Sequence, residues 1–181
     1  GVTIVTIDSG VRRELVSSEY GVRREQCEEA ARILGVKALR DVTPEQLAAN
    51  IDKLPEIAAK RATHVVYEDQ RTLDTVAALE RGDLEAVGRY MNASHASLRD
   101  LYEVSVPEVN VIADLTQKQP GVFGARIMGG GFGGAVIALV KDAAVEGVLD
   151  TVVRGYREAT GREAQVYHAK AGPGSNAMPL E

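Results

Sequence analysis

The stretch RIMGGGFGGAVIALV, residues 126–140, decides the fold because it joins two strand-like runs through a glycine-rich loop. Glycine fills five of the six positions in 129–134. The run 135–140 that follows is short, apolar and rich in branched side chains, which is typical of a buried strand. No helical segment separates 126–128 from 135–140. The two strands must therefore be antiparallel, because a parallel pair requires a long crossover.

The glycine loop has two interpretations that its residues leave open. It is either a tight turn, since glycine reaches positive φ without strain, or a phosphate-facing loop whose main-chain N–H groups converge on an anion. Gly129, Gly131 and Gly134 fit G-x-G-x-x-G, but a dinucleotide-binding fingerprint opens a helix, and this loop leads into a strand. With Val136 the pattern also fits a protein-kinase loop, yet H-R-D and D-F-G are absent from the sequence. No Lys-Ser or Lys-Thr follows the glycines, which excludes a Walker loop.

The other elements follow in the order strand, helices, two strands, helix, strand. Strands are predicted at 2–7 and 165–169, and an apolar repeat at Cys27, Ala30, Ala31 and Leu34 predicts a helix that begins near Arg23 and ends at Gly35. Further helices are predicted at 56–80, after Asp83, and at 143–160. Two segments match a capping box, Thr43-Pro44-Glu45-Gln46 and Ser105-Val106-Pro107-Glu108. This order predicts an α+β fold, an antiparallel sheet covered by a helical layer.

Composition excludes several functional classes. The chain has 181 residues, of which 45% are hydrophobic and 26% charged, and its net charge is −5. An acidic chain is not a general nucleic-acid binder, which needs a basic surface. No apolar run reaches the roughly 18 to 20 residues that span a bilayer. The single cysteine, Cys27, cannot form an intrachain disulfide, which suits a reducing compartment. We expect no nucleic-acid or membrane partner and a cytoplasmic location.

Three segments together resemble a known family. SSEYGVRREQCEEAARILG (17–35), SHASLRDLYEVSVPEVN (94–110) and GARIMGGGFGGAVIALV (124–140) are similar to the C-terminal half of galactokinases, which belong to the GHMP small-molecule kinases. The resemblance covers nearly the whole chain in one register. It implies that 1–170 form the ferredoxin-like C-terminal domain of a two-domain sugar kinase. That enzyme phosphorylates the anomeric hydroxyl of galactose with ATP and Mg²⁺, giving galactose 1-phosphate, in a cleft shared with its own N-terminal domain.

The resemblance also implies roles for particular residues. Tyr20 matches the family tyrosine that hydrogen-bonds the sugar, and Arg12 matches an arginine near the phosphates. The loop glycines match the phosphate side of the family site; they are Gly129, Gly130, Gly131, Gly133 and Gly134. Met128 departs from the family, in which threonine is usual at that position.

The remaining candidate residues have simpler interpretations. Arg13, Arg23 and Arg24 are expected to be solvated partners of surface ion pairs, and Cys27 is expected to be a core residue. The histidines show no metal-ligand spacing with one another or with cysteine; they are His64, His95 and His168.

Two family motifs are absent from this sequence, R-x-N-L-I-G-E-H-x-D-Y and P-x-G-x-G-L-S-S-S. The resemblance therefore places the catalytic base, the Mg²⁺ ligand and most of the ATP contacts outside this chain. We expect no catalytic or metal-binding residue here and no sugar kinase activity from the chain alone. Residues 171–181 are predicted to be a flexible tail, partly of artificial origin. The alternative function is a non-catalytic small-molecule-binding or regulatory domain of the same fold.

Overall fold

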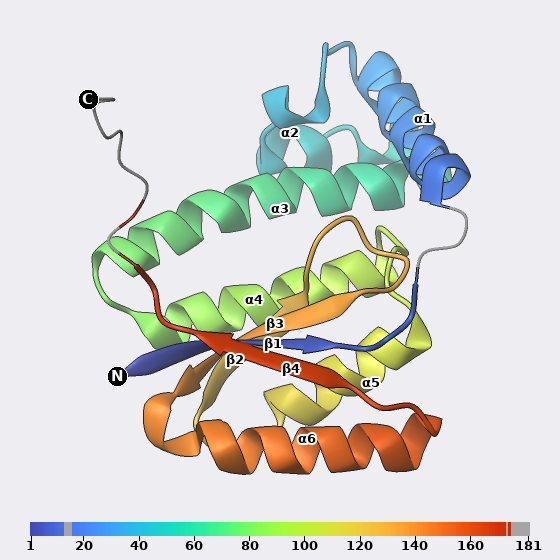
Figure 1. The fold of residues 1–181 in the computed structure, drawn as a ribbon. Coiled ribbons are helices and arrows are strands. Elements are labelled where there is room, and N and C mark those ends of the chain that lie inside the picture. Colours follow the sequence, from blue (N-terminus) through green and yellow to red (C-terminus); the bar gives the residue numbers. More distant parts are fainter. Residues whose placement is uncertain (13–15, 173, 175–181) are drawn as a thin grey trace, which may run out of the picture.

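The computed structural model describes residues 1–12, 16–172 and 174 of the chain. Within them, four strands form one antiparallel sheet in the order β2-β3-β1-β4 (Figure 1). The strands are β1 (Val2–Asp8), β2 (Val122–Ile127), β3 (Ala135–Lys141) and β4 (Gln165–Ala169). Strands β2 and β3 pair antiparallel, with Ile127 opposite Val136, on either side of the glycine loop. The strand topology inferred from 126–140 is confirmed.

Helices cover one face and one edge of this sheet, which confirms the predicted α+β fold (Figure 1). The α-helices are α1 (Val16–Leu34), α2 (Pro44–Ala48), α3 (Glu56–Glu80), α4 (Leu84–Asp100), α5 (Pro107–Gln117) and α6 (Val145–Thr160). Single 3₁₀ turns are η1 (Leu39–Asp41), η2 (Ile51–Lys53) and η3 (Asp142–Ala144). Helices α1 and α2 lie beyond α3, on the side away from the sheet (Figure 1).

The main core lies between the sheet and helices α5 and α6. Burial alternates along β1, where Val5 and Ile7 point inward while their neighbours are half exposed, as a strand with one covered face requires. The inner face is completed by buried side chains from β2, β3, α5 and α6; they are Ala125, Ile127, Val136, Ala138, Val140, Val109, Ile112, Val148, Val152 and Tyr156. This core fixes both strands that flank the glycine loop.

Helix α4 lies along the free edge of β2. Gly88 and Gly124 let the two backbones touch, because a Cβ on Gly88 would lie 1.9 Å from the Phe123 carbonyl oxygen. Two outward N–H groups of β2 are satisfied by α4 side chains: Ala125 donates to Asn92 Oδ1 at 2.9 Å and Ile127 to His95 Nδ1 at 3.2 Å. Side-chain acceptors thus replace a further strand and protect this edge. The strand that leads into the glycine loop is held on both sides.

A second core joins α1 to α3. Small and branched apolar residues from α1, η1, α2, α3 and the links between them form it; they are Ala30, Ala31, Leu39, Val42, Leu47, Leu54, Ala58, Ala62 and Val66. Cys27 is half buried and packs against this cluster, as expected. The cluster anchors the second half of α1.

Helix α1 is longer than the sequence pattern predicts, since it begins at Val16 and not near Arg23. The predicted start was wrong because Glu19 and Tyr20 in the first turns are exposed. An exposed turn adds nothing to the apolar repeat that set the predicted boundary.

The two capping-box predictions have different outcomes. Thr43 and Gln46 make both reciprocal bonds of the box at the start of α2. At α5 the N-cap residue is Val106, and the Ser105 hydroxyl instead donates to Asn110 Oδ1 at 2.6 Å. Arg13 and most of the tail predicted for 171–181 lie outside the described residues.

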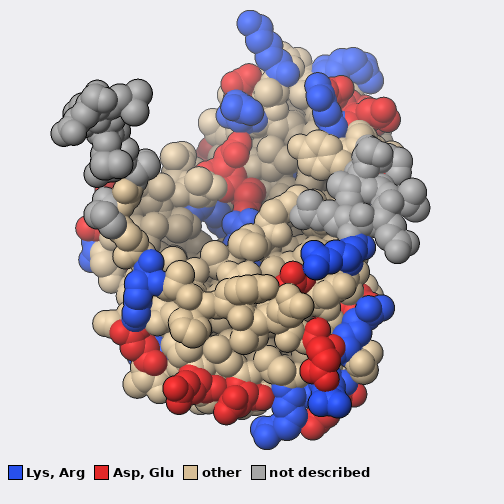
Figure 2. All heavy atoms as spheres, in the orientation of Figure 1, with Lys and Arg blue, Asp and Glu red and all other residues tan. Residues whose placement is uncertain are grey.

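Charged residues of both signs are interspersed over the face drawn in Figure 2, and a broad area of uncharged residues occupies its lower half. The described part of the chain contains no helix long and apolar enough to cross a membrane.

Candidate functional site

Four segments meet at one end of the sheet. They are the glycine loop (128–134), the segment after β1 (9–12), the first half of α1, and the link between α4 and α5 (101–106), which we call the α4–α5 connection. Gly134 N–H donates to the Val11 carbonyl at 3.1 Å, and Phe132 N–H donates to the Val104 carbonyl at 2.6 Å. The loop is therefore hydrogen-bonded to two of its neighbours, and it rises toward the first turns of α1 (Figure 1).

The five loop glycines fall into distinct groups. Gly131 and Gly133 are buried with φ of +87° and +128°, and a Cβ there would lie 2.4 Å from the Val104 carbonyl oxygen and 2.7 Å from that of Val11. These two glycines let the loop approach its own chain. Gly134 has φ +85°, and an added Cβ would meet no atom within 4 Å. Glycine is therefore needed there for its backbone conformation and not for a close contact. Gly129 and Gly130 are exposed, and their main chain is accessible to a ligand.

Two non-glycine residues adopt left-handed backbone conformations beside one another. Phe132 in the loop has φ 60° and Glu103 in the α4–α5 connection has φ 55°. Each such residue costs roughly 1 to 2 kcal/mol and persists only where its surroundings hold it. The Phe132 to Val104 hydrogen bond joins the two strained sites. The packing and hydrogen bonds around the loop therefore impose one particular geometry on it.

Ser9 and Tyr156 anchor the base of the loop, and the sequence patterns missed both roles. The buried Ser9 hydroxyl donates to the Gly134 carbonyl at 2.6 Å, and the Tyr156 hydroxyl donates to the Ser9 carbonyl at 2.7 Å. The sequence predicts only that Tyr156 lies in the helix at 143–160 and that Ser9 follows the strand at 2–7. The available signal was the hydroxyl of Tyr156, because a buried tyrosine requires a hydrogen-bond partner.

Tyr20 lies on α1 with 56% of its surface exposed. It borders a cavity of about 890 Å³ between α1, η1 and α3. Its lining mixes apolar side chains such as Leu39 and Val65 with charged ones such as Arg24 and Asp69, and Tyr102 also lines it. Its described lining residues do not include the loop glycines. The structure thus places Tyr20 at an accessible cavity, on a helix that is tied to the loop by its neighbour Arg23.

Arg23 is not the solvated ion-pair partner that was predicted. Its side chain is only 11% exposed, although it lies 3.7 Å from Glu19. Its Nε donates to the Tyr102 carbonyl at 2.7 Å and its Nη2 to the Glu103 carbonyl at 2.9 Å. The guanidinium also sits 5.8 Å from the centre of the Phe132 ring. The adjacent Arg24 matches its prediction, as an exposed partner of Glu28.

Arg61 of α3, which the sequence did not single out, is the buried counterpart of Arg23. Its Nε donates to Gln26 Oε1 at 2.7 Å, its Nη2 donates to Glu103 Oε2 at 2.7 Å, and its Nη1 donates to the Leu101 carbonyl. Together the two arginines, one from α1 and one from α3, bind residues 101–103 of the α4–α5 connection. Arg12, the remaining predicted site residue, is exposed and directly follows Val11 beside the loop.

The buried histidines belong to the structural support of α3 and α4. His64 Nδ1 lies 2.8 Å from Ser97 Oγ, and its ring stacks on Tyr102 at 4.5 Å between centroids. Burial lowers the pKa of His64 to about 4, and it also lowers the pKa of His95. Among the described residues, no group of three or more His, Cys, Asp or Glu side chains is placed to hold a metal ion.

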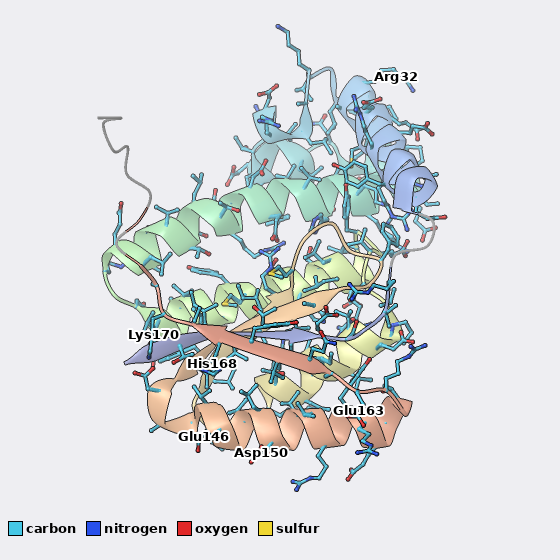
Figure 3. All side chains as sticks on the ribbon, in the orientation of Figure 1. Arg32, Glu146, Asp150, Glu163, His168 and Lys170 are labelled. Carbon is cyan, nitrogen blue, oxygen red and sulfur yellow. The ribbon has the colours of Figure 1, made fainter. Side chains whose placement is uncertain are left out.

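These pKa shifts predict how stability depends on pH. An unfolded histidine titrates near pH 6.5, so between about pH 6.5 and 4 the unfolded chain binds a proton that folded His64 does not. The stability that depends on neutral His64 should therefore be fully present above pH 6.5. The free energy of unfolding should fall by on the order of 2 to 3 kcal/mol as the pH drops toward 4. Urea unfolding at a series of pH values measures this slope. His64→Gln should reduce this slope and leave the part that belongs to His95, while His168→Gln, on the exposed strand β4 (Figure 3), serves as the control. An equal slope in all three proteins would contradict the assignment.

Comparison with known proteins identifies the class of this domain. The family described as GHMP kinases C terminal matches residues 75–158. The galactokinase of Roseiflexus sp. (strain RS-1) is 43% identical over 99% of this chain and 49% of its own length. The galactokinase of Thermotoga neapolitana (strain ATCC 49049) is 48% identical over 87% of this chain and 44% of its own. The chain spans about half the length of these curated relatives.

Solved structures agree with the sequence matches. The crystal structure of Lactococcus lactis galactokinase complexed with galactose superposes with a TM-score of 0.91 at 38% identity, covering 98% of this chain and 47% of that one. Methanococcus jannaschii mevalonate kinase shares the fold, with a TM-score of 0.50 at 20% identity over 93% of this chain and 39% of that one. The chain belongs to the GHMP kinase family and carries its C-terminal domain. Within that family it is similar to galactokinases over almost its whole length.

Proposed function

We propose that this chain is the C-terminal part of a galactokinase, which transfers a phosphoryl group from ATP to the anomeric hydroxyl of galactose. The observation that carries the proposal is the likeness to the Lactococcus lactis enzyme complexed with galactose, at 38% identity over 98% of this chain. The convergence of the glycine loop, the segment of Arg12 and the helix of Tyr20 at one end of the sheet supports it.

The proposal gives the residues of this chain different tasks. Tyr20 binds a sugar hydroxyl, because this exposed tyrosine lines the cavity. The phosphate side is formed by the accessible main chain of Gly129 and Gly130 and by Arg12, whose guanidinium suits phosphate oxygens. Gly131, Gly133 and Gly134 act on the same side by shaping the loop.

When bound, ATP supplies the phosphoryl group, and Mg²⁺ neutralises its charge. We place the catalytic base, the Mg²⁺ ligand and most nucleotide contacts in the N-terminal half of the full-length protein that contains this chain. Phosphoryl transfer depends chiefly on positioning and electrostatic stabilisation. In this proposal the chain aligns the sugar with the phosphates. The cytoplasmic location stays a prediction.

A sugar panel tests the proposal. The full-length protein is assayed for ADP release with ATP, Mg²⁺ and galactose, N-acetylgalactosamine or glucose, and the product with galactose is identified as galactose 1-phosphate. We expect turnover to be greatest with galactose. Galactose binding without turnover would favour the non-catalytic alternative, and turnover confined to another sugar would overturn the substrate assignment.

A further inference from the structure

Arg23 connects the helix that carries Tyr20 to the two segments that carry backbone strain. It lies three residues after Tyr20, close to one helical turn, and its side chain points to the α4–α5 connection. Its two hydrogen bonds go to the carbonyls of the two successive peptide groups that flank Glu103, which is the left-handed residue of that connection. The same guanidinium lies against the ring of Phe132, the left-handed residue of the glycine loop.

Among its described residues, the stretch of α1 around Tyr20 is more exposed than the second half of the helix. The second half of α1 is held by the apolar cluster around Ala30 and Ala31 and by Gln26, which binds Arg61. Glu19 and Tyr20, by contrast, are exposed. Hydrogen bonds from a charged guanidinium are stronger than neutral ones and directional. Arg23 is thus a direct, directional link between this exposed end of the helix and the loop.

From this arrangement we propose that Arg23 is a positioning residue that sets the placement of Tyr20 relative to the glycine loop. It does not touch substrate. It acts by holding the peptide groups around Glu103 and the Phe132 ring in place beside α1. The inference rests on the function proposed above for Tyr20 and the loop.

Hydrogen exchange in the full-length protein tests the positioning without reference to activity. In Arg23→Gln, the amides of the loop peptide 128–134 should exchange at least about tenfold faster, because the charged hydrogen bonds that brace Glu103 are lost. Peptides from β3 should exchange as in the wild type. Arg23→Lys, which keeps the charge but not the two-pronged geometry, should show a smaller increase of the same kind. Arg32→Gln, at the outer end of α1 (Figure 3), is the matched control and should change nothing. Unchanged loop exchange in both folded Arg23 variants would overturn the proposal.

A double-mutant cycle with Tyr20→Phe supplies the kinetic test. Loss of one neutral hydrogen bond should raise KM for galactose by roughly 2- to 13-fold in the wild-type background. In Arg23→Lys, where Tyr20 is already displaced, the same substitution should cost at most about twofold, because coupled residues are not additive. A merely structural role for Arg23 would reduce the folded fraction and the apparent kcat while leaving the two effects additive. Full additivity would therefore contradict positioning.

The two tests separate the inference from the proposed function. If the wild-type protein does not phosphorylate galactose, the proposed function fails, and faster loop exchange in the Arg23 variants still supports the positioning role. If the enzyme is active but the cycle is additive and the exchange is unchanged, the positioning role fails alone.

Discussion

Gly131→Ala is expected to lower the free energy of unfolding by about 3 kcal/mol or more, the sum of a left-handed backbone penalty and a steric clash. The new Cβ would lie 2.4 Å from the Val104 carbonyl oxygen and 2.5 Å from Val104 Cβ, at φ +87°. Backbone cannot rotate away as a flexible side chain can. For a unit of 181 residues the loss corresponds to a fall in Tm of about 6 to 12 °C, and the fall is smaller in a longer protein that unfolds as one unit, because its unfolding entropy is larger.

Thermal unfolding of the full-length protein measures this effect, with Gly147→Ala as the matched control. Gly147 lies inside α6, and a Cβ added there would meet no atom within 4 Å, so alanine should raise stability by up to about 1 kcal/mol. Gly130→Ala should keep the Tm and lower kcat if the exposed main chain faces the phosphates. A wild-type Tm in Gly131→Ala would contradict the described loop geometry.

Arg61→Ala is expected to cost about 1.5 to 3 kcal/mol, because it removes a buried charged donor from Gln26 and the Leu101 carbonyl. Arg61 is 2% exposed, so water cannot fully replace these bonds. The half-exposed Glu103 carboxylate would lose its ion pair, but it can turn to water. The hydrogen bond from Arg61 also lowers the pKa of Glu103, because it stabilises the charged carboxylate.

Urea unfolding of the full-length protein at pH 7 provides the measurement for Arg61, with Arg32→Ala as the control. Arg32 is an exposed arginine of α1 and should leave the midpoint unchanged. A midpoint for Arg61→Ala that equals that of the control would show that the α4–α5 connection is held by other contacts.

The fold could be predicted from the sequence because its deciding features are local. Two strands joined without a helix must be antiparallel, and the stretch 126–140 contains both strands and the loop between them. Capping is local too, yet Thr43 forms its box while Ser105 does not. The Ser105 hydroxyl donates to Asn110 Oδ1, five residues further along the chain, and does not cap the helix. The same residue pattern therefore supports two local outcomes.

The site could be predicted only in part, because what distinguishes its residues lies far away in the sequence. Arg23 and Arg24 are identical neighbours, but the carbonyl acceptors of Arg23 belong to a segment about 80 residues further on. The loop glycines likewise look equivalent until Val104 and Val11 are placed against Gly131 and Gly133. Residue identity and spacing carry no information about such distant neighbours.

The most direct test of the central claim, that this chain supplies the sugar-side and phosphate-side groups of a galactokinase, is the kinetic role of Tyr20. Initial rates of galactose phosphorylation are measured against galactose concentration for the full-length protein and its Tyr20→Phe variant, at saturating ATP. Tyr167→Phe, an equally exposed tyrosine on β4 at 58%, is the control. We predict that Tyr20→Phe raises KM for galactose by roughly 2- to 13-fold, as the loss of one neutral hydrogen bond implies, with KM for ATP and Tm unchanged. Wild-type KM for galactose and wild-type kcat in this variant would contradict the account.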